Sequence, residues 1–259
     1  MNNLRFALAT DNSGEPSYYY ENNKYYRSST KEDITHTDLP YTAFFTYPAL
    51  FDGGHFINLS ENILPSIEFD LIFAAIEKNP QYLNKLKKAY PKAKIVGLYK
   101  EVWNHNLDVR EYIIKNTEAF VHPYHTVDFY GKYKLSIPKK PYIIPQPTDH
   151  IAIQKRFGLP DKTNQIFNYN KKSSAGRGSV NNKIILNAIS PILKEINYNG
   201  PRGLQPFIED WNKSQYMLST DIFDMGGLQS CQCAILNTIM VGSNTDYQKV
   251  LFPDLVGTD

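Results

Sequence analysis

The chain has 259 residues, 42% of them hydrophobic, which is enough for one large domain or for two of ordinary size. Its 28 basic residues nearly balance its 26 acidic ones, which excludes a strong overall attraction to polyanions but not a local basic groove. No segment approaches the roughly 18 apolar residues of a membrane span, and the first five residues lack the apolar run of a signal peptide. We therefore expect a cytoplasmic protein.

The only two cysteines, Cys231 and Cys233, are too few and too close for a disulfide framework or a structural zinc site. We expect both to be reduced, partly buried thiols.

The first half of the chain alternates apolar strands with amphipathic helices. The pattern predicts strands at 6–9, 69–73, 94–99 and 119–121, and helices at 79–90 and 108–116. The segment 18–47 is rich in Tyr, Asn, Ser and Thr without a clear period, and it reads as irregular structure or as a hairpin. Strands separated by helices of this length favour a parallel sheet with crossover connections.

The second half repeats the alternation after an extended connector at 138–147, which carries four prolines. We place a domain boundary near Thr148. The pattern then predicts a strand at 165–169, a basic glycine-containing loop at 171–179, a helix at 182–196 interrupted by Pro191, and a helix at 209–218. The fold class is therefore α/β in both halves.

A glycine pair near the C-terminus is the most specific local feature. Asp224 precedes Gly226 and Gly227, a predicted helix follows, and an apolar run at 234–241 reads as a buried strand. Glycine allows a sharp turn or a close approach of the backbone to a ligand. A helix that begins there can hold a phosphate at its N-terminus.

Three motifs in chain order resemble those of GT-B glycosyltransferases, especially the retaining branch with the Glu-x7-Glu signature. Asp224 stands at the first acidic position and Gln232 at the second, with Asn237 beginning the stretch that replaces Gly-Thr-Pro-Val-Val. The segment 142–149 resembles the interdomain Val-Ile-Pro-Asn-Pro-Ile-Asp, and 167–178 resembles a strand followed by diphosphate-gripping basic residues. Together the matches cover about residues 65 to 255.

The resemblance implies two Rossmann-like domains whose parallel sheets face an interdomain cleft. Residues 1–147 would form the acceptor-side domain and 148–259 the nucleotide-sugar-binding domain. The family usually adds a C-terminal helix that crosses back, so the resemblance implies a minimal version, or one completed by another chain. The implied activity is transfer of a hexosyl or pentosyl group from a nucleotide diphosphate sugar, such as a UDP-sugar, to a hydroxyl acceptor.

The resemblance also assigns donor-binding residues. Lys172 and Arg177 would stabilise the charge of the departing diphosphate; the alternative is a solvated basic loop. Gly226 and Gly227 would bring backbone amides to the donor, or form a plain tight turn. Gln232 would contact the ribose through its amide, or it is an exposed helical glutamine without a role.

Candidate catalytic residues come from both halves. Asp224 would orient the donor sugar, or it caps a helix. Asp11, which follows the first strand, is the leading candidate for the base that an inverting mechanism needs, whereas a retaining mechanism needs none. His122 and His125 follow a strand and could bond a sugar hydroxyl or leaving group; the alternative, for them and for His55, is a structural histidine with its hydrogen bonds satisfied.

Two departures from the family leave other functions open. Gln232 lacks the charge of the second glutamate, and the family's C-terminal helix is missing; both allow a non-catalytic nucleotide-sugar-binding protein. Small enzymes of this fold include phage enzymes that glycosylate hydroxymethylated pyrimidines in DNA, and such an enzyme would act in the host cytoplasm. A DNA acceptor would need a basic cleft, for which the lysines at 132, 134, 139 and 140 are material. We expect no cofactor and no metal site.

Overall fold

The computed structural model describes residues 4–11, 16–22, 24–34, 47–48, 53–98, 107–122, 142–144, 154, 158–168, 187–188, 194–197, 204–219 and 228–242. The chain divides into two compact units. The first unit runs from Met1 to Pro147 and the second from Thr148 to Asp259, except that His36–Tyr41, outside the described residues, is grouped with the second.

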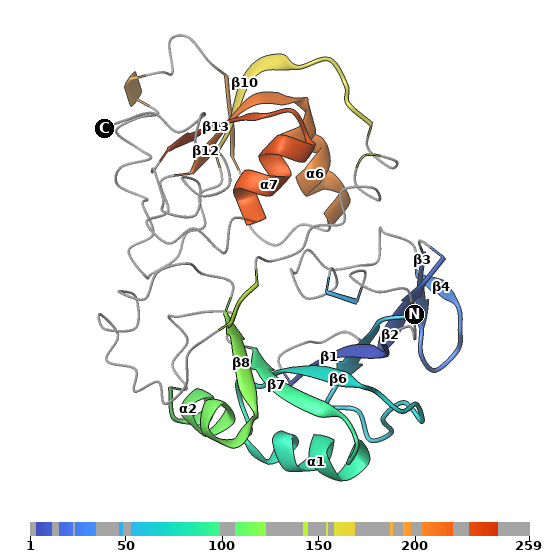
Figure 1. Cartoon of the computed structure of the whole chain (residues 1–259). Helices are drawn as coiled ribbons and strands as arrows, with labels where there is room; N and C mark the ends of the chain where they lie inside the picture. Colours follow the sequence, from blue (N-terminus) through green and yellow to red (C-terminus); the bar gives the residue numbers. More distant parts are fainter. Residues whose placement is uncertain are drawn as a thin grey trace. The chain divides into compact units, whose positions relative to one another are not determined.

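Within the described residues, the first unit is built on a nine-stranded sheet with the order β4-β3-β2-β5-β1-β6-β7-β8-β9 (Figure 1). The strands from β5 to β9 in that order are parallel, and β2, β3 and β4 extend the sheet in antiparallel fashion. The strands are β1 (Phe6–Thr10), β2 (Tyr18–Glu21), β3 (Lys24–Arg27), β4 (Asp33–Ile34), β5 (His55–Asn58), β6 (Leu71–Ala75), β7 (Lys94–Leu98), β8 (Ala119–His122) and β9 (Tyr142–Ile143).

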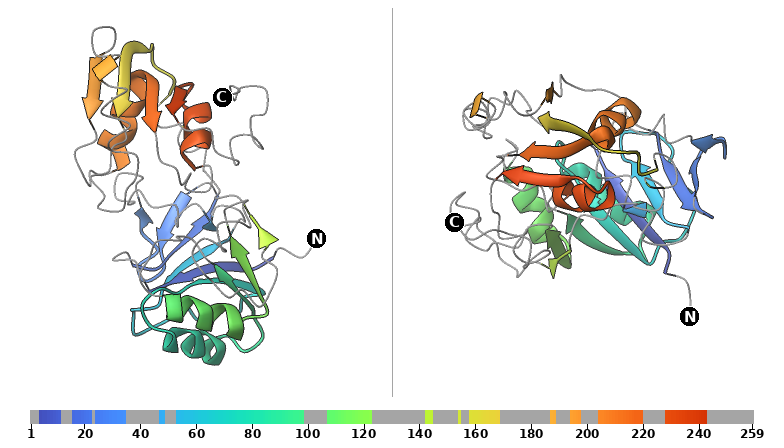
Figure 2. Two further views of the ribbon diagram at one scale, coloured as in Figure 1. Left: turned by 90° about the vertical axis from the view of Figure 1, so that its left-hand side faces the viewer. Right: turned by 90° about the horizontal axis from the view of Figure 1, so that it is seen from above.

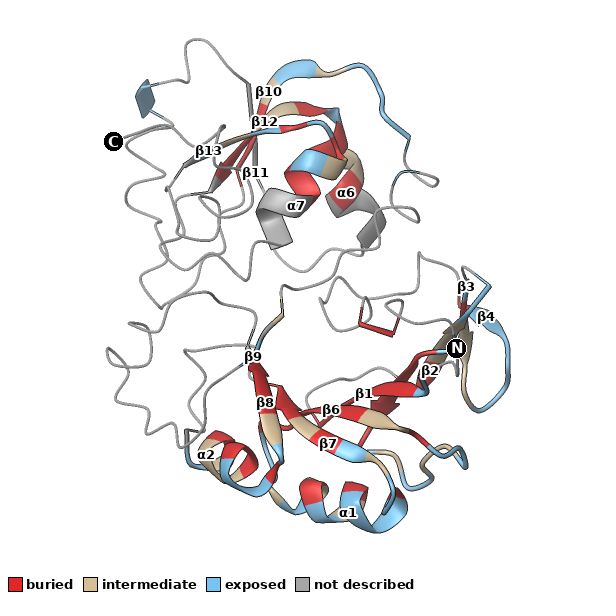
Figure 3. Cartoon of the chain, viewed as in Figure 1, coloured by how far each residue is buried: buried red, intermediate tan, exposed pale blue. Residues whose placement is uncertain are grey.

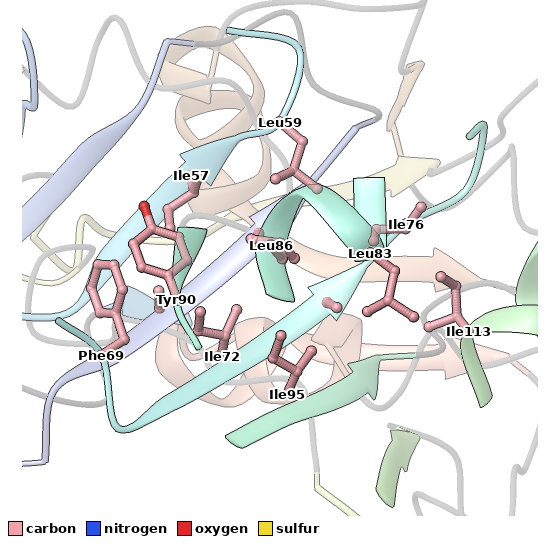
Figure 4. Packing of buried hydrophobic residues seen from close by; sticks show 13 residues of the cluster. Ile57, Leu59, Phe69, Ile72, Ile76, Leu83, Leu86, Tyr90, Ile95 and Ile113 are labelled. Atoms are coloured by element: carbon pink, nitrogen blue, oxygen red, sulfur yellow. The ribbon is translucent and has the colours of Figure 1, made fainter. Parts of the chain in front are cut away.

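Helices α1 (Gln81–Ala89) and α2 (Leu107–Asn116) cover one face of this sheet (Figure 1). In α1, Leu83 and Leu86 are fully buried while the lysines of the last turn are exposed, as an amphipathic helix requires. The two leucines and Ile113 of α2 pack on the sheet residues of the core cluster (Figure 4). Each such side chain contributes about 1.5–3 kcal/mol by burial.

The antiparallel extension is tied to the parallel sheet by aromatic pairs across the strands. The ring of Tyr19 stacks on Tyr26 with centroids 5.2 Å apart and on His55 at 5.4 Å. On the opposite face Tyr18 stacks on Phe56 at 4.6 Å. Cross-strand aromatic pairs stabilise a sheet, so they account for a hairpin in a segment with little periodicity.

Gly97 of β7 allows α2 to lie close to the sheet. A Cβ atom at this position would stand 3.2 Å from Ile113 Cγ2 and 3.2 Å from Thr117 Oγ1. Those distances are tighter than ordinary van der Waals contact, so a larger residue would force the helix away from the strand.

In the described part of the second unit, four parallel strands form a sheet with the order β11-β10-β12-β13. They are β10 (Thr163–Asn168), β11 (Lys194–Asn197), β12 (Ser214–Ser219) and β13 (Ile239–Gly242). Helices α6 (Leu204–Lys213) and α7 (Leu228–Ile235) lie side by side against it (Figure 2).

Both helices of the second unit pack on the same face of its sheet. Trp211 of α6 stacks on Phe167 of β10 with ring centroids 5.9 Å apart. Cys233 of α7 lies with its Sγ 3.3 Å from the Sδ of Met217 in β12. Trp211, Phe167, Met217 and Cys233 are all buried, so this face forms a core of its own. The buried parts of α6, α7 and β12 are red in Figure 3.

Hydrogen bonds from Lys162 hold the C-terminal ends of both α6 and α7, and a capping turn closes α7. Lys162 donates from Nζ to the backbone oxygens of Asn212 and Leu236, and burial lowers the pKa of its ammonium group. At the end of α7, Thr238 N–H donates to Cys233 O at 2.8 Å, and Asn237 has a φ of 51°. This is the Schellman arrangement, in which a left-handed residue closes the helix.

The structure confirms the α/β class and its two mainly parallel sheets. Each strand predicted in the first half has its counterpart in β1, β6, β7 or β8, and the two helices have theirs in α1 and α2. The hairpin interpretation holds for Tyr18–Arg27, where β2 and β3 pair. The strand predicted at 165–169 is β10, and Cys233 is a buried free thiol.

Three predictions of secondary structure are wrong. The helix predicted at 209–218 ends at Lys213, and the next residues form β12. Lys194–Ile196, predicted as helix, belongs to β11, and Ala234–Ile235, assigned to the apolar strand, belongs to α7. Short apolar runs fit both periods, and their place in the sheet decides between them.

Two further expectations concern the strand after the glycine pair and the basic loop at 171–179. The strand after the glycine pair is not a buried one, because Ile239 is 54% and Val241 36% exposed. The loop predicted at 171–179 lies outside the described residues.

Candidate functional site

The first unit has a topological switch point between β1 and β6. From β1 the chain passes to β5 on one side, and from β6 it passes to β7 on the other. Thr10 and Ala75 are aligned in the sheet, so the carboxyl ends of the two strands lie next to each other. In open parallel sheets, ligands bind in the crevice outside such a pair of strand ends.

Asp11 bridges this switch point with its carboxylate. Its Oδ1 accepts a hydrogen bond from Glu77 N–H at 2.8 Å. Its Oδ2 accepts from Lys78 N–H and from Asn79 N–H, both at 2.8 Å. With only 3% of its surface exposed, the residue at the end of β1 fixes the turn that follows β6.

These bonds bear on the predicted role of Asp11 as a base. Both carboxylate oxygens already accept amide protons, and the side chain is buried. A general base needs an oxygen within hydrogen-bond reach of the substrate proton. The geometry favours a positioning role, and the catalytic role of Asp11 stays a prediction.

The turn held by Asp11 is anchored on its other side by a buried ion pair. Arg110 of α2 lies with Nη2 3.5 Å from Oε1 of Glu77, and the two side chains are 4% and 6% exposed. Asn79 Oδ1 accepts from Gln81 N–H at 3.0 Å, where α1 begins. Between Glu77 and Asn79, the side chain of Lys78 is exposed.

The second unit has its own switch point between β10 and β12. From β10 the chain passes to β11, and from β12 it passes to β13 on the other side. Asn168, almost fully buried, and Leu218 are aligned near the carboxyl ends of the two strands. The segments 169–186 and 220–227 continue the chain from these two ends.

Most residues predicted to bind the donor fall in those two segments. Lys172 and Arg177 follow β10, and Asp224, Gly226 and Gly227 follow β12; all five lie outside the described residues. Their roles stay predictions. One expectation about them is confirmed by the backbone, because α7 begins at Leu228, directly after the glycine pair.

Gln232 belongs to α7 and is only 3% exposed. Its backbone oxygen accepts from Leu236 N–H at 2.9 Å as part of the helix. The alternative of an exposed helical glutamine is therefore wrong. The predicted contact of its amide with a ribose is not tested.

Of the three candidate histidines, only His55 has a side chain that the structure describes. His122 ends β8, but its side chain and all of His125 lie outside what the structure describes. His55 is buried between Tyr19 and Phe69, and burial lowers its pKa to about 4. A neutral histidine among aromatic rings fits the structural alternative.

Glu77, Lys78 and Arg110 were not among the predicted site residues. The rule that selected Asp11 also applies to β6, because Glu77 and Lys78 follow a predicted strand just as Asp11 does. Arg110 gave no signal of its own, since it lies within a predicted helix. Within the described ranges, no three His, Cys, Asp or Glu side chains gather as a metal site would require.

No model of a known protein family matches the sequence, and no curated protein sequence matches it either. Among solved structures, the chain is similar to Anabaena Alr3699/HepE in complex with UDP-glucose, with 11% sequence identity and a TM-score of 0.46. The similarity covers 95% of this chain and 82% of the other. A likeness of this size says nothing about the ligand of the present chain. None of the described helices is long and apolar enough to cross a membrane.

Proposed function

We propose that the protein is a GT-B-type glycosyltransferase that moves a sugar from a nucleotide diphosphate sugar to a hydroxyl acceptor. The observation that carries the proposal is the order of elements in the second unit. The segment with Asp224 and the glycine pair leaves the carboxyl end of β12 at the switch point and enters α7 at Leu228. Parallel sheets bind ligands at this edge, and a helix N-terminus can hold a phosphate.

The basic segment after β10 supports the same proposal. Lys172 and Arg177 follow the strand that neighbours β12 at the switch point. Both proposed donor-binding segments therefore start from adjacent strand ends. Cations placed there would stabilise the negative charge of a departing nucleotide diphosphate.

The end of α7 also agrees with the resembled motif. Asn237 stands where that motif has glycine, and it adopts a left-handed φ of 51°. Glycine and asparagine are the residues that take this conformation most readily. The substitution thus keeps the backbone turn between α7 and β13.

In the first unit, the bonds of Asp11 favour a retaining transfer over an inverting one. A retaining enzyme needs no base on the acceptor side, whereas an inverting one would have to use Asp11 or another residue there. A non-catalytic binding protein is the second candidate. It is favoured by Gln232, which replaces a charged residue of the resembled motif.

A thermal-shift screen with UDP-, GDP- and ADP-sugars tests donor binding. We expect at least one of them to raise the melting temperature, and no shift with any would refute the proposal. Lys172→Ala combined with Arg177→Ala should remove the shift. Lys213→Ala, which changes an exposed lysine at the end of α6, is the matched control. Donor hydrolysis or transfer would then separate an enzyme from a binding protein.

A further inference from the structure

The antiparallel extension of the first sheet, formed by β2, β3 and β4, is joined to the parallel strands over a short distance. Within the described residues, two residue pairs align β2 with β5, one of them Tyr19 with His55. Two backbone bonds continue the junction, from Tyr20 N–H to Gly54 O at 2.8 Å and from Gly53 N–H to Tyr20 O at 2.7 Å. By comparison, β1 and β6 are aligned over five pairs. The extension is therefore a unit that can open locally while the parallel sheet stays intact.

His55 lies at this junction with its ring enclosed. The ring stacks on Tyr19 with centroids 5.4 Å apart and meets Phe69 edge to face at 5.3 Å. The residue is 7% exposed, and its Nδ1 is buried without a hydrogen-bond partner among the residues that the structure describes. His55 thus differs from a structural histidine with its hydrogen bonds satisfied. A protonated ring here would be a buried charge between two aromatic side chains, which is costly.

Among the described residues, no charged group compensates for that cost. The residue of β1 aligned with His55 is Ala7. The titratable groups on β2, beside Phe69 and at the end of α1 are Tyr19, Glu21, Asp70 and Tyr90. Asp70 is bonded to Arg5, Tyr90 O–H donates to a backbone oxygen, and Glu21 is exposed. Burial accordingly lowers the pKa of His55 to about 4.

We propose that His55 is an acid-sensitive latch, whose protonation releases the extension from β5 while the parallel sheet stays folded. Release separates the ring of Tyr19 from the imidazole and brings the imidazole into water, where its charged form is solvated. The step takes one proton from solvent and breaks no covalent bond. It leaves β5 as the edge of the parallel sheet, with N–H and C=O groups that can pair with another strand.

The size of the effect follows from the pKa of His55 in the two states. Its pKa is about 4 when the extension is in place and about 6.5 once the ring reaches water. Because the value in the closed state is the lower one, closure is fully favoured above pH 6.5 and weakens as the pH falls towards 4. We expect the equilibrium constant for release to rise about 20-fold between pH 7 and pH 5.

Hydrogen exchange of the whole protein, corrected for the intrinsic pH dependence of exchange, tests the latch. The reporters are the amides of Tyr20 and Gly53, whose bonds cross the junction. The references are the amides of Ile72 and Phe73 in β6. At pH 7 the reporters should exchange faster than the references, and at pH 5 their protection should be about 20-fold lower. Reporters that exchange no faster than the references, or that keep their protection at pH 5, would overturn the proposal.

Two substitutions separate His55 from a second titratable group that holds the extension. Glu61 accepts bonds from Ser17 N–H at 3.1 Å and from Ser17 Oγ at 2.5 Å, just before β2. His55→Phe keeps an aromatic ring against Tyr19 but cannot take up a proton, so the protection of the reporters should be nearly the same at pH 7 and pH 5. In Glu61→Gln, the matched control, it should still fall about 20-fold. A fall of that size that persists in His55→Phe would refute the latch, whatever Glu61→Gln shows.

Discussion

The three amide bonds of Asp11 predict a large loss of stability when its carboxylate is removed. In an Asp11→Ala protein, the N–H groups of Glu77, Lys78 and Asn79 would all lose their acceptor.

The magnitude follows from the burial of the three amides. A buried donor left without a partner costs about 1–3 kcal/mol. The bond from Glu77 is buried, whereas those from Lys78 and Asn79 are partly buried, so water can replace part of the latter two. We expect a total loss of about 3–5 kcal/mol for Asp11→Ala. Asp11→Asn keeps one acceptor oxygen and should lose about 1–2 kcal/mol.

Urea unfolding measures the free energy, and hydrogen exchange locates the change. Glu118→Gln is the control, because Glu118 is an exposed carboxylate of the same unit. The amides of residues 77–79 should exchange much faster in both Asp11 variants, and those of α7 in the other unit should not. If Asp11→Ala were no less stable than Glu118→Gln, the positioning role would be refuted.

Three other features of the fold can be tested in the same way. Burial lowers the pKa of His55 to about 4, against about 6.5 in the unfolded chain. The stabilisation of the fold by the neutral His55 side chain is therefore complete above pH 6.5 and is lost as the pH falls towards 4. The free energy of unfolding, measured with urea, should fall by about 2 kcal/mol between pH 7 and pH 5. The fall should be smaller in the His55→Phe protein. Gly97→Ala should cost about 1–3 kcal/mol, because the new Cβ would press on Ile113 and Thr117; an unchanged urea midpoint would contradict this. Lys162→Met should cost about 1–3 kcal/mol by releasing the ends of α6 and α7, and equal stability to Lys213→Met would contradict this.

The sequence predicts the first unit well because its elements carry clear local signals. In α1, leucines stand at helical spacing among lysines, and the structure buries Leu83 and Leu86 and exposes Lys87 and Lys88. In the second unit, Tyr216–Leu218 gave no such signal. Those residues form strand because β10 and β13 flank them in the sheet, and that pairing depends on distant residues.

The same limit applies to the candidate site of the first unit. The position of Asp11 after the first strand is visible in the sequence. Its partners are 66 to 68 residues away in the chain, and they meet Asp11 only because β1 and β6 are neighbours in register. A pattern of local residues cannot supply that register, so the sequence could suggest a base but not its bonds.

The energies favour the positioning role of Asp11 even within a glycosyltransferase. General base catalysis accelerates a step by about 10²- to 10⁴-fold, which corresponds to about 3–5 kcal/mol. A base must take up the proton, however, and a protonated Asp11 would weaken its bonds to the three amides. Weakening even one or two of them costs about 1–3 kcal/mol, which offsets much of the catalytic gain. A retaining transfer needs no base on the acceptor side, so under the proposed function it would leave the three amide bonds of Asp11 intact.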